Sequence, residues 1–594
     1  MNSAEEINLA LKEFSKGNKK SAYKKLKQIF KKNKDNDQLR FNLAVIAQTL
    51  NLNDEAKDYY QFLIDKNSNH KAMINLYLLY IKESNFEEAL KIINNIGDEY
   101  KKEKNIIKDK AFILYKLKQY DQSIHICNTH LKDSDDINFL NILGLNYFSV
   151  NNLERSEAIF KKALDINENN PSILNSIGRI YHEKRDSKNA EKYLLRAYNI
   201  DNNSYEIINN LAGFYREEGN YSKSIDLYLK ALQINPQNYA IINNLAKAYF
   251  DSDKLEMAEE CCLKALKLNN NDGNIQKILS LIYLRKQNYK DGWAYFDGRL
   301  NLSDFVEKNS TIRNIRSKLI NKTKLNKKLK LLVLREQGIG DEILYGTMYG
   351  DLLSHCENVK IECDPRLKNI FSKSFPESKN CFLEFGAVSL DKTKLDGFDN
   401  AIYAGSLGKF FRNKYEHFNN GIYLKADDEL VNASKLKLQD LDNKINIGIS
   451  WKSFKNRYSK EKSLILENFD KIFETKNCNF INLQYGNVLE EINDYNKKFN
   501  KNIITLENLD LINDFDNLAA VLKNLDLFIS VSNSTAHLAG ALGVNTLLIR
   551  PDNHAVFHYW NQTDNKTPWY KSINFVSRNE IVDTKNLIDR FLNT

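Results

Sequence analysis

A run of small polar residues late in the chain has the composition expected of an anion-binding turn. The segment LFISVSNSTAHLAGALGVNTLLI spans residues 527–549. Its apolar, β-rich start predicts a strand, and its Ala/Gly/Leu-rich continuation predicts a helix. Such a turn directs the unpaired amides of the first helical residues, and the positive end of the helix dipole, at a ligand beyond the strand. The residues expected to meet a phosphate there are Ser532, Asn533, Ser534, Thr535, Ala536 and His537. The same segment also fits an ordinary βαβ unit in which Ser and Thr only cap the helix.

A carboxylate occupies a comparable position earlier in the chain. The sequence KLLVLREQGIGDEIL predicts a buried strand at 331–334, a turn containing Gly338 and Gly340, and a helix that begins near Asp341. This order places Asp341 at the carboxyl edge of a parallel sheet, where α/β proteins bind their ligands. Asp341 also fits a simple helix cap. The motif is not a dinucleotide fingerprint, because Ile343 occupies its third glycine position.

Other polar residues follow predicted strands or open predicted helices. The strand at 445–449 ends in Ser450, Trp451 and Lys452, and a later strand ends in Gln484. We expect all three polar side chains, Ser450, Lys452 and Gln484, to contact the bound ligand: Lys452 its anionic group, and Gln484 a neighbouring part such as a base or ribose. The segment GSLGKFFR places three further polar side chains on a loop or helix start. These residues, Ser406, Lys409 and Arg412, are candidates with Gly340 for contacts to a second substrate, although exposed basic residues are usually only solvated.

The elements that must position these residues alternate between strands and helices, twice over, from residue 329 to the end. This alternation predicts two Rossmann-like domains, at 329–440 and 441–594, with a cleft between them and a helix at the C-terminus. Residues 301–328 are rich in Lys and Arg and predict a solvated connector.

Residues 1–300 repeat themselves. A small residue, or Tyr77 in its place, recurs every 33 or 34 positions, and a second small position follows twelve residues after each. The first set is Ala10, Ala44, Ala111, Gly144, Gly178, Ala212, Ala246 and Ser280. Two helices per repeat that cross closely at small residues explain the spacing. The pattern resembles a tetratricopeptide-repeat solenoid of about nine units.

Such solenoids commonly hold extended peptides in a concave groove. Asparagines recur two residues before the small position, at Asn42, Asn75, Asn210 and Asn244. In O-GlcNAc-transferase-like solenoids an asparagine ladder at the equivalent place grips a peptide backbone. Asparagine is abundant throughout this chain, so composition alone also explains these positions.

The final repeat is unusual, because its second helix reads NYKDGWAYFDGRL. It resembles the GxWxxYxxR-type ending of bacterial tetratricopeptide-glycosyltransferase fusions. We expect Trp293 and its neighbours to dock the repeats on the next domain.

Several motifs together resemble the GT-B half of those fusion proteins, which is related to the ADP-heptose:lipopolysaccharide heptosyltransferases. They are LREQGIGDEIL, GSLGKFFR, GISWKS, NLQYG and SNSTAHLAGALG. The resemblance implies an α-solenoid followed by a GT-B glycosyltransferase module, with the acceptor side in 329–440 and the nucleotide-sugar side in 441–594. The chain has Ser532-Asn533 where the family more often has Asp-Thr, and Gly408 where relatives often have Pro.

The resemblance also implies roles for single residues. Asp341 matches the proposed base of heptosyltransferases, and the 534–537 amides with Lys452, and Arg457 as a further candidate, would stabilise the leaving diphosphate. Metal-independent, inverting transfer follows, with a nucleotide-sugar as substrate and no cofactor. The expected acceptor is a protein held by the solenoid. Two alternatives are transfer to lipopolysaccharide or another glycan, and an inactive GT-B scaffold that serves protein interaction.

The bulk composition narrows the classes of protein to which this chain can belong. The chain has 594 residues, 86 Lys and Arg, and 77 Asp and Glu, so its net charge of +9 is small and interspersed. We expect no nucleic-acid partner on this basis. The seven cysteines show no metal-ligand spacing, and neither a signal peptide nor a long apolar run occurs. A cytoplasmic protein without an integral membrane segment is predicted.

Overall fold

The computed structural model describes residues 3–132, 135–302, 315–320, 325–419, 422–439, 441, 444–454, 462–550, 558–560, 566–578, 581 and 588. The predicted connector and C-terminal helix lie partly outside these residues, and Arg457 lies outside them. The packing divides the chain into two compact units, Met1–Glu218 and Gly219–Thr594. Each unit is described by itself.

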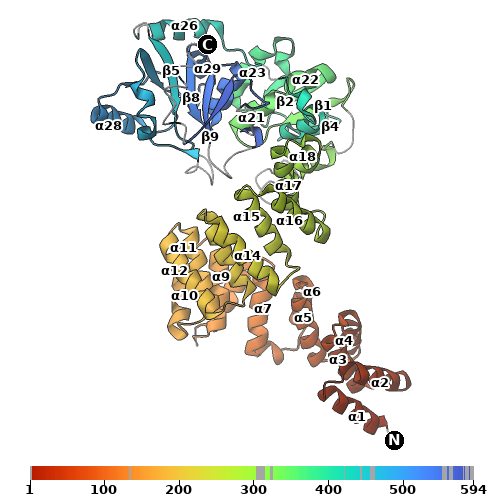
Figure 1. The fold of residues 1–594 in the computed structure, drawn as a ribbon. Helices are drawn as coiled ribbons and strands as arrows, with labels where there is room; N and C mark the ends of the chain where they lie inside the picture. Colours follow the sequence, from red (N-terminus) through yellow and green to blue (C-terminus); the bar gives the residue numbers. More distant parts are fainter. Residues whose placement is uncertain are drawn as a thin grey trace. The chain divides into compact units, whose positions relative to one another are not determined.

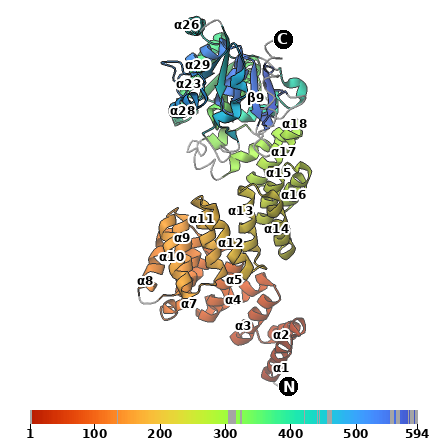
Figure 2. The ribbon, with the colours of Figure 1, turned by 60° about the vertical axis from the view of Figure 1, so that its left-hand side comes forward.

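The first unit consists of paired antiparallel helices (Figures 1 and 2). Its helices are α1 (Ser3–Ser15), α2 (Lys19–Lys32), α3 (Asp37–Thr49), α4 (Asn53–Asn67), α5 (His70–Lys82), α6 (Phe86–Asn94), η1 (Tyr100–Lys102), α7 (Lys104–Lys116), α8 (Tyr120–His130), α9 (Ile137–Ser149), α10 (Leu153–Ile166), α11 (Pro171–Glu183), α12 (Ser187–Ile200) and α13 (Tyr205–Glu217). Several of these helices begin where an Asn or Asp side chain accepts from an amide of the first turn, as Asn170 does from Ile173 at 3.2 Å.

The repeated small residues lie where the helices of a pair cross. A Cβ on Gly144 would come within 2.6 Å of the Phe160 ring, so only glycine fits this crossing. The second small position is bonded to the first: Ser156 Oγ donates to the Gly144 carbonyl at 2.8 Å, and Ser123 Oγ to the Ala111 carbonyl at 2.8 Å. The periodicity of the sequence therefore arises from helix contact inside each repeat.

The second unit begins with further repeats. Their helices are α14 (Tyr221–Ile234), α15 (Tyr239–Asp251), α16 (Leu255–Leu268), α17 (Gly273–Arg285), α18 (Tyr289–Phe296) and η2 (Asp297–Asn301). The bond between the two small positions recurs in the last pair, where Ser280 Oγ donates to the Gly292 carbonyl at 2.7 Å.

A four-stranded parallel sheet follows, in the order β3-β2-β1-β4. Its strands are β1 (Lys330–Leu334), β2 (Asn358–Cys363), β3 (Phe382–Glu384) and β4 (Asn400–Tyr403). Register pairs Leu332 of β1 with Lys360 of β2 and Ala401 of β4. The connecting helices are η3 (Arg316–Lys318), α21 (Ile339–Gly346), α22 (Tyr349–His355), α23 (Pro365–Ser374), η4 (Pro376–Cys381), α24 (Lys392–Leu395), η5 (Ala404–Leu407), α25 (Gly408–Phe411) and η6 (Tyr415–His417).

A six-stranded parallel sheet completes the unit, in the order β10-β9-β8-β5-β6-β7. Its strands are β5 (Ile445–Ser450), β6 (Cys478–Asn482), β7 (Ile503–Ile504), β8 (Leu527–Val531), β9 (Thr546–Arg550) and β10 (Ile573–Ser577). The helices are α26 (Asp428–Gln439), η7 (Leu466–Phe469), η8 (Ile472–Glu474), α28 (Leu489–Phe499), α29 (Phe515–Lys523), α30 (Ser534–Leu542) and η10 (His558–Trp560). The first strand of each sheet thus lies inside its sheet, which is the Rossmann-like order.

One hydrophobic core joins the last repeat to both sheets. The same buried cluster contains Trp293 of α18, Tyr345 of α21, Leu538 of α30 and Trp569 near β10. Because these residues come from three parts of the chain, α17 and α18 pack as part of the α/β region while continuing the repeat pattern.

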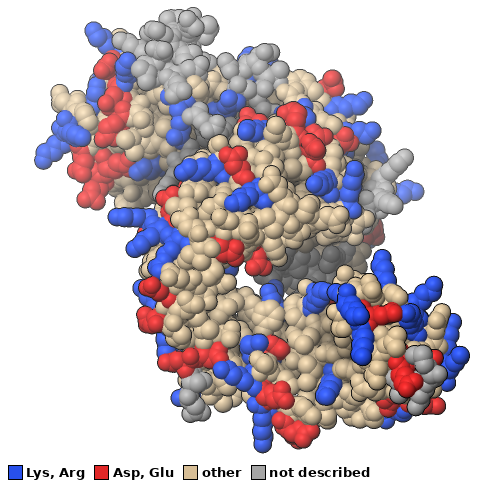
Figure 3. All heavy atoms as spheres, turned by 60° about the horizontal axis from the view of Figure 1, so that its bottom comes forward, with Lys and Arg blue, Asp and Glu red and all other residues tan. Residues whose placement is uncertain are grey.

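Charged side chains are mixed over the molecular surface. Lys and Arg alternate with Asp and Glu over the face drawn in Figure 3. Among the residues that the structure describes, no helix is both long and apolar enough to cross a bilayer.

Candidate functional site

The two parallel sheets each have a point where the strand order reverses, and ligands of such sheets bind outside the carboxyl ends of the strands there. In the smaller sheet this point lies between β1 and β4, and in the larger sheet between β5 and β8. The predicted site residues that directly follow β1, β5 and β8 therefore lie at the expected edges.

At the edge of the larger sheet, Asn533 connects the ends of β5 and β8, the two strands between which the strand order reverses. Its Nδ2 donates to Ser450 Oγ at 2.7 Å, while its Oδ1 accepts from the Ala536 amide at 3.0 Å. The side chain thus ties the end of β5 to the first turn of α30 and caps that helix. Asn533, which stands where the resembling proteins more often have Thr, therefore caps the helix, and Ser532 stands where they more often have Asp.

Gln484 holds the loop that follows β5. Its Oε1 accepts from Ser450 Oγ at 3.0 Å and from the amides of Trp451 and Lys452 at 2.8 and 2.6 Å. Its Nε2 donates to the Tyr485 carbonyl at 2.8 Å. The side chain is buried and fixes the start of the Lys452 loop, and its contact with a donor stays a prediction.

Lys452 lies at the mouth of a cavity of about 830 Å³. Its Nζ is ion-paired with Glu491 Oε2, and Trp451 Nε1 donates to the other oxygen of the same carboxylate at 3.2 Å. The cavity lining is Lys452, Ser463, Leu464, Ile465, Glu467, Asn468, Asp470, Lys471, Arg578 and Ile581. This lining holds three cations, Lys452, Lys471 and Arg578, and two carboxylates, Glu467 and Asp470, and neither Asp341 nor His537 belongs to it.

The first turn of α30 is buried, and its imidazole is fixed by aromatic residues. His537 Nδ1 lies 3.1 Å from Tyr570 Oη, and its ring stacks on Trp560 at 4.6 Å between centroids. Trp560 Nε1 in turn donates to Ser532 Oγ at 2.8 Å. Ser532, Thr535, Ala536 and His537 are all buried. These contacts hold the first turn of α30 in place beside the end of β8.

The first turn of α21 lies against the first turn of α30. An added Cβ on Gly340 would lie 3.0 Å from His537 Cδ2 and 3.5 Å from Ser534 Cα. Two helix N-termini, one from each α/β half, therefore meet at Gly340. Since the positive ends of two helix dipoles point here, their junction favours negative charge.

Asp341 is the third residue of α21 and lies in this junction. Its Oδ2 accepts from the Gly338 amide at 3.2 Å. The carboxyl is partly accessible to solvent but is enclosed by protein on most sides. This burial, and to a smaller extent the charge of Glu336, raises the pKa of Asp341 from 3.8 to about 6. The Gly338 N–H and Lys462 oppose this rise. A carboxylate with a pKa near neutrality is suited to accept a proton from a substrate.

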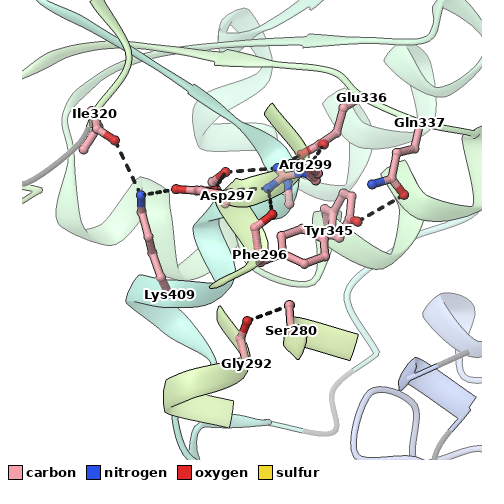
Figure 4. A network of polar contacts seen from close by, with 12 residues as sticks. Ser280, Gly292, Phe296, Asp297, Arg299, Ile320, Glu336, Gln337, Tyr345 and Lys409 are labelled. Atoms are coloured by element: carbon pink, nitrogen blue, oxygen red, sulfur yellow. Dashed lines mark hydrogen bonds and ion pairs between the residues drawn. The ribbon is translucent and has the colours of Figure 1, made fainter. Parts of the chain in front are cut away.

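Apart from Gly340, the predicted second-substrate residues lie elsewhere. Lys409 Nζ pairs with Asp297 at 2.7 Å (Figure 4). Ser406 Oγ donates to the same carboxylate. Arg412 is buried and donates to Asp351 and to the Thr347 carbonyl, both at 2.7 Å. All three side chains take part in the packing around the last repeat, and a role in acceptor binding stays a prediction.

The asparagines of the predicted groove bond to neighbouring side chains. In the first unit, Asn210 Nδ2 donates to Asn175 Oδ1 at 3.1 Å, and Asn75 Nδ2 to Tyr60 Oη at 3.2 Å. Asn42 Oδ1 accepts from Gln38 at 3.2 Å. Asn244 lies on α15 in the second unit. The contact between Asn175 and Asn210 joins consecutive repeats, as a ladder would.

Sequence analysis missed several residues around Asp341. Buried Lys462 lies within electrostatic range of it, and so do Tyr559 and Tyr570. Lys462 is hidden in a Lys-rich stretch, whereas the Tyr559-Trp560 and Trp569-Tyr570 pairs were visible as aromatic doublets near the last strand. Across the described part of the chain no three His, Cys, Asp or Glu side chains gather as a metal site requires. Metal independence stays a prediction.

Comparison with known proteins identifies the repeats. Family models described as "Tetratricopeptide repeat" match residues 137–170 and 171–204, and another with the same description matches 215–282. "Protein FlbA" of Caulobacter vibrioides is 24% identical over 259 residues, which are 41% of this chain and 42% of FlbA. The match therefore spans less than half the length of that relative.

Two solved structures that resemble parts of this chain have low sequence identity to it. A thermophilic tetratricopeptide-repeat protein of Thermus thermophilus, TTC0263, is 18% identical, with a TM-score of 0.29, over 30% of this chain and 98% of that one. Human IFIT1 is 16% identical, with a TM-score of 0.35, over 47% of this chain and 72% of that one. With the family matches, the observed helix pairs make about the first 300 residues a tetratricopeptide-repeat solenoid, followed by a region of two parallel α/β sheets.

Proposed function

We propose that this protein is a glycosyltransferase that moves a sugar from a nucleotide-sugar donor to an acceptor hydroxyl. The observation that carries the proposal is the packing of Gly340, the neighbour of Asp341, against the first turn of α30, together with the burial that raises the pKa of Asp341 to about 6. A base and an anion-binding helix end close together are two groups that transfer from a diphosphate donor needs. The GT-B resemblance of the motifs gives the donor class.

The proposed reaction is a direct displacement. The acceptor hydroxyl gives its proton to Asp341 as its oxygen bonds to the anomeric carbon, and the bond from that carbon to the diphosphate oxygen breaks with inversion. Amides of residues 534–537 and the Lys452 ammonium stabilise the charge that builds on the leaving diphosphate. Protein cations take the place of a metal ion in this scheme.

A protein is the acceptor we favour. Tetratricopeptide repeats bind other proteins, and the solenoid fills about half of the chain. The Asn175–Asn210 contact supports a peptide groove of the kind predicted from the asparagines. A lipopolysaccharide-type glycan is the alternative acceptor.

Thermal shift with UDP-, ADP-, GDP- and CMP-sugars tests the donor class, because a ligand that binds the folded state raises the melting temperature. Mass spectrometry of the stabilising donor, incubated with the protein, then reports hydrolysis or transfer. We expect one nucleotide to stabilise the wild type and Asp341→Asn alike, and turnover only in the wild type. No stabilisation by any of the four would refute a donor site.

A protein-interaction scaffold without activity is the second candidate. The ion pair of Lys452 with Glu491 and the fully bonded polar atoms of Gln484 favour it, since both side chains already have partners. The scaffold predicts that partners captured by the solenoid are unaltered in mass, whereas the transferase predicts a glycosyl addition to one of them.

A further inference from the structure

The last repeat reaches the strand-reversal point of the smaller sheet. Arg299, in η2, is only 3% exposed, and it meets the carboxylate of Glu336, which closely follows β1. Arg299 Nε donates to Glu336 Oε2 at 2.7 Å, and Nη2 donates to Oε1 at 2.6 Å (Figure 4). Two parallel bonds fix direction as well as distance, which a single cation contact does not.

Glu336 also connects β1 to β4. Its Oε1 accepts from the Gly405 amide at 2.6 Å. A Cβ on Gly405 would lie 2.7 Å from that oxygen and 2.9 Å from both Phe296 Cε1 and Tyr345 Cζ. The repeat, the strand ends and α21 therefore pack together at this glycine without spare room.

The segment next to Gly405 is fixed to the same repeat. Trp293 Nε1 donates to the Arg412 carbonyl at 2.9 Å, and a Cβ on Gly408 would lie 2.4 Å from the Trp293 ring. Asp297 binds Lys409 and Ser406. The repeat is thus anchored beside Glu336 on several sides, so Arg299 presents a fixed guanidinium to it.

The loop held by Glu336 carries Asp341. Glu336 is five residues before Asp341, and Tyr345, which packs at Gly405, is four residues after it on α21. The intervening Gln337 has a positive φ of 63°, a conformation that needs support from its surroundings in a non-glycine residue. Support for this loop comes from its fixed end at Glu336.

We propose that Arg299 is a positioning residue of the active site: by clamping Glu336 it sets the loop that presents Asp341 to the acceptor. The inference rests on the proposed glycosyl transfer and extends it, because it makes the last tetratricopeptide repeat a working part of the transferase. Removal of the guanidinium also leaves the Glu336 charge unbalanced in the buried junction.

The charged and titratable groups around Asp341 define the expected electrostatic effect. They are Glu336 from the β1 loop, Lys462 from the segment after β5, Tyr345 from α21, Tyr559 from η10 and Tyr570 from the segment before β10. His537 of α30 lies against the neighbouring Gly340. Glu336 is the negative group among them, and Arg299 neutralises it. Loss of Arg299 therefore disfavours ionised Asp341 and moves the acid limb of the pH–rate profile to higher pH.

The test compares Arg299→Met, Arg299→Lys and the double variant Arg299→Met with Glu336→Gln in the full chain. Lys286→Gln is the matched control, since Lys286 lies in the same repeat and pairs with Glu259 at 2.8 Å within the solenoid. Hydrogen exchange of peptides spanning residues 330–346, turnover of the stabilising nucleotide-sugar against pH, and nucleotide affinity by calorimetry are measured for each.

We expect faster exchange of this peptide in both Arg299 variants, turnover lower by about 100-fold, and unchanged nucleotide affinity. The acid limb should move to higher pH in Arg299→Met and return in the double variant, which has no unbalanced charge. If Arg299→Met is unfolded at the assay temperature, hydrogen exchange and turnover are compared between Arg299→Lys and the wild type instead. Wild-type exchange and turnover in a folded Arg299 variant would overturn the inference while leaving the transferase intact. A wild type without turnover on any donor would refute the transferase instead.

Discussion

Gly340 of α21 lies so close to His537 of α30 that a methyl group on it would come within 3.0 Å of the imidazole. The two residues belong to different α/β halves, and their approach brings the two helix N-termini together. The absence of a side chain at 340 is therefore what allows the predicted base and the predicted anion site to lie close to one another.

Replacement of Gly340 by Ala should push these helices apart by a few tenths of an ångström, because the neighbouring ring is held by Trp560 and Tyr570. We expect turnover to fall about tenfold or more with a small loss of nucleotide affinity. Gly350→Ala is the control, since its Cβ would have ordinary contact at 3.7 Å with Phe375. Equal turnover in the two variants would show that the approach of the helices does not matter.

Asp341→Asn tests the base. The variant keeps the size of the side chain and an oxygen that can accept from the Gly338 amide, but it cannot take a proton. We expect turnover to fall by about 10²- to 10⁴-fold with nucleotide affinity nearly unchanged. In the wild type, turnover should rise with pH through about 6, where Asp341 ionises. A fully active Asn variant would remove the assigned role.

The same substitution should raise the stability of the folded protein at high pH, although it lowers turnover. Below pH 3.8 Asp341 is protonated in both the folded and the unfolded state, and between 3.8 and about 6 only the folded state keeps the proton. Wild-type stability therefore falls as pH rises from 3.8 to about 6, and the neutral Asn variant lacks this loss. Allowing for partial solvent access, we expect Asp341→Asn to be more stable at pH 8 by on the order of 1–2 kcal/mol in chemical denaturation.

Glu157 provides the contrast for that measurement. Burial by itself would raise its pKa, but Lys161, Lys184 and Tyr181 lower it to about 2. Its contribution to stability is complete above its unfolded pKa of 4.5 and is lost only as pH falls toward 2. Glu157→Gln should therefore destabilise the protein by nearly the same amount at about pH 5 and at pH 8, whereas the stability gained by Asp341→Asn should grow between these two values because Asp341 ionises near pH 6. A similar pH response of the two variants would contradict the assignment of the shift to Asp341.

The sequence predicted the regular parts of this molecule because their causes are local. The spacing of Gly144 and Ser156 follows from helices that cross within one repeat, and the alternation around Asn533 follows from a strand joined to a helix. Chain order also predicted that Asp341 and Ser450 lie at sheet edges, because parallel strands align their carboxyl ends.

The parts that escaped prediction depend on contacts between distant segments. Ser406, Lys409 and Arg412 looked available for a substrate, but their partners lie on the last repeat and on α22, and no local pattern reveals such pairs. The function of Glu336 was hidden for the same reason, since Arg299 precedes it by 37 residues. Lys462 was obscured by composition, because lysine is common throughout the chain.

Lys452 and Glu491 give a paired test of the anion site. Lys452→Ala removes the cation, so nucleotide affinity should fall by about tenfold. Glu491→Gln removes the competing carboxylate and frees the ammonium, so affinity should rise, and more so at low salt. Calorimetry with the stabilising nucleotide measures both changes. Unchanged affinity in the two variants would place the donor phosphates away from the β5 loop.

The boundary between acceptor platform and transferase can be located by truncation. Removal of residues 1–270 keeps α17, α18 and η2, whose Trp293 and Arg299 pack into the α/β region. We expect this protein to fold, to bind the nucleotide and to hydrolyse the donor, but to lose transfer to a protein acceptor. Removal of residues 1–302 deletes Trp293 and leaves Glu336 buried without its cation, so it should lower the melting temperature and abolish hydrolysis. Transfer that persists after the first truncation would show that the solenoid does not hold the acceptor, and hydrolysis that persists after the second would show that the last repeat is dispensable for the site.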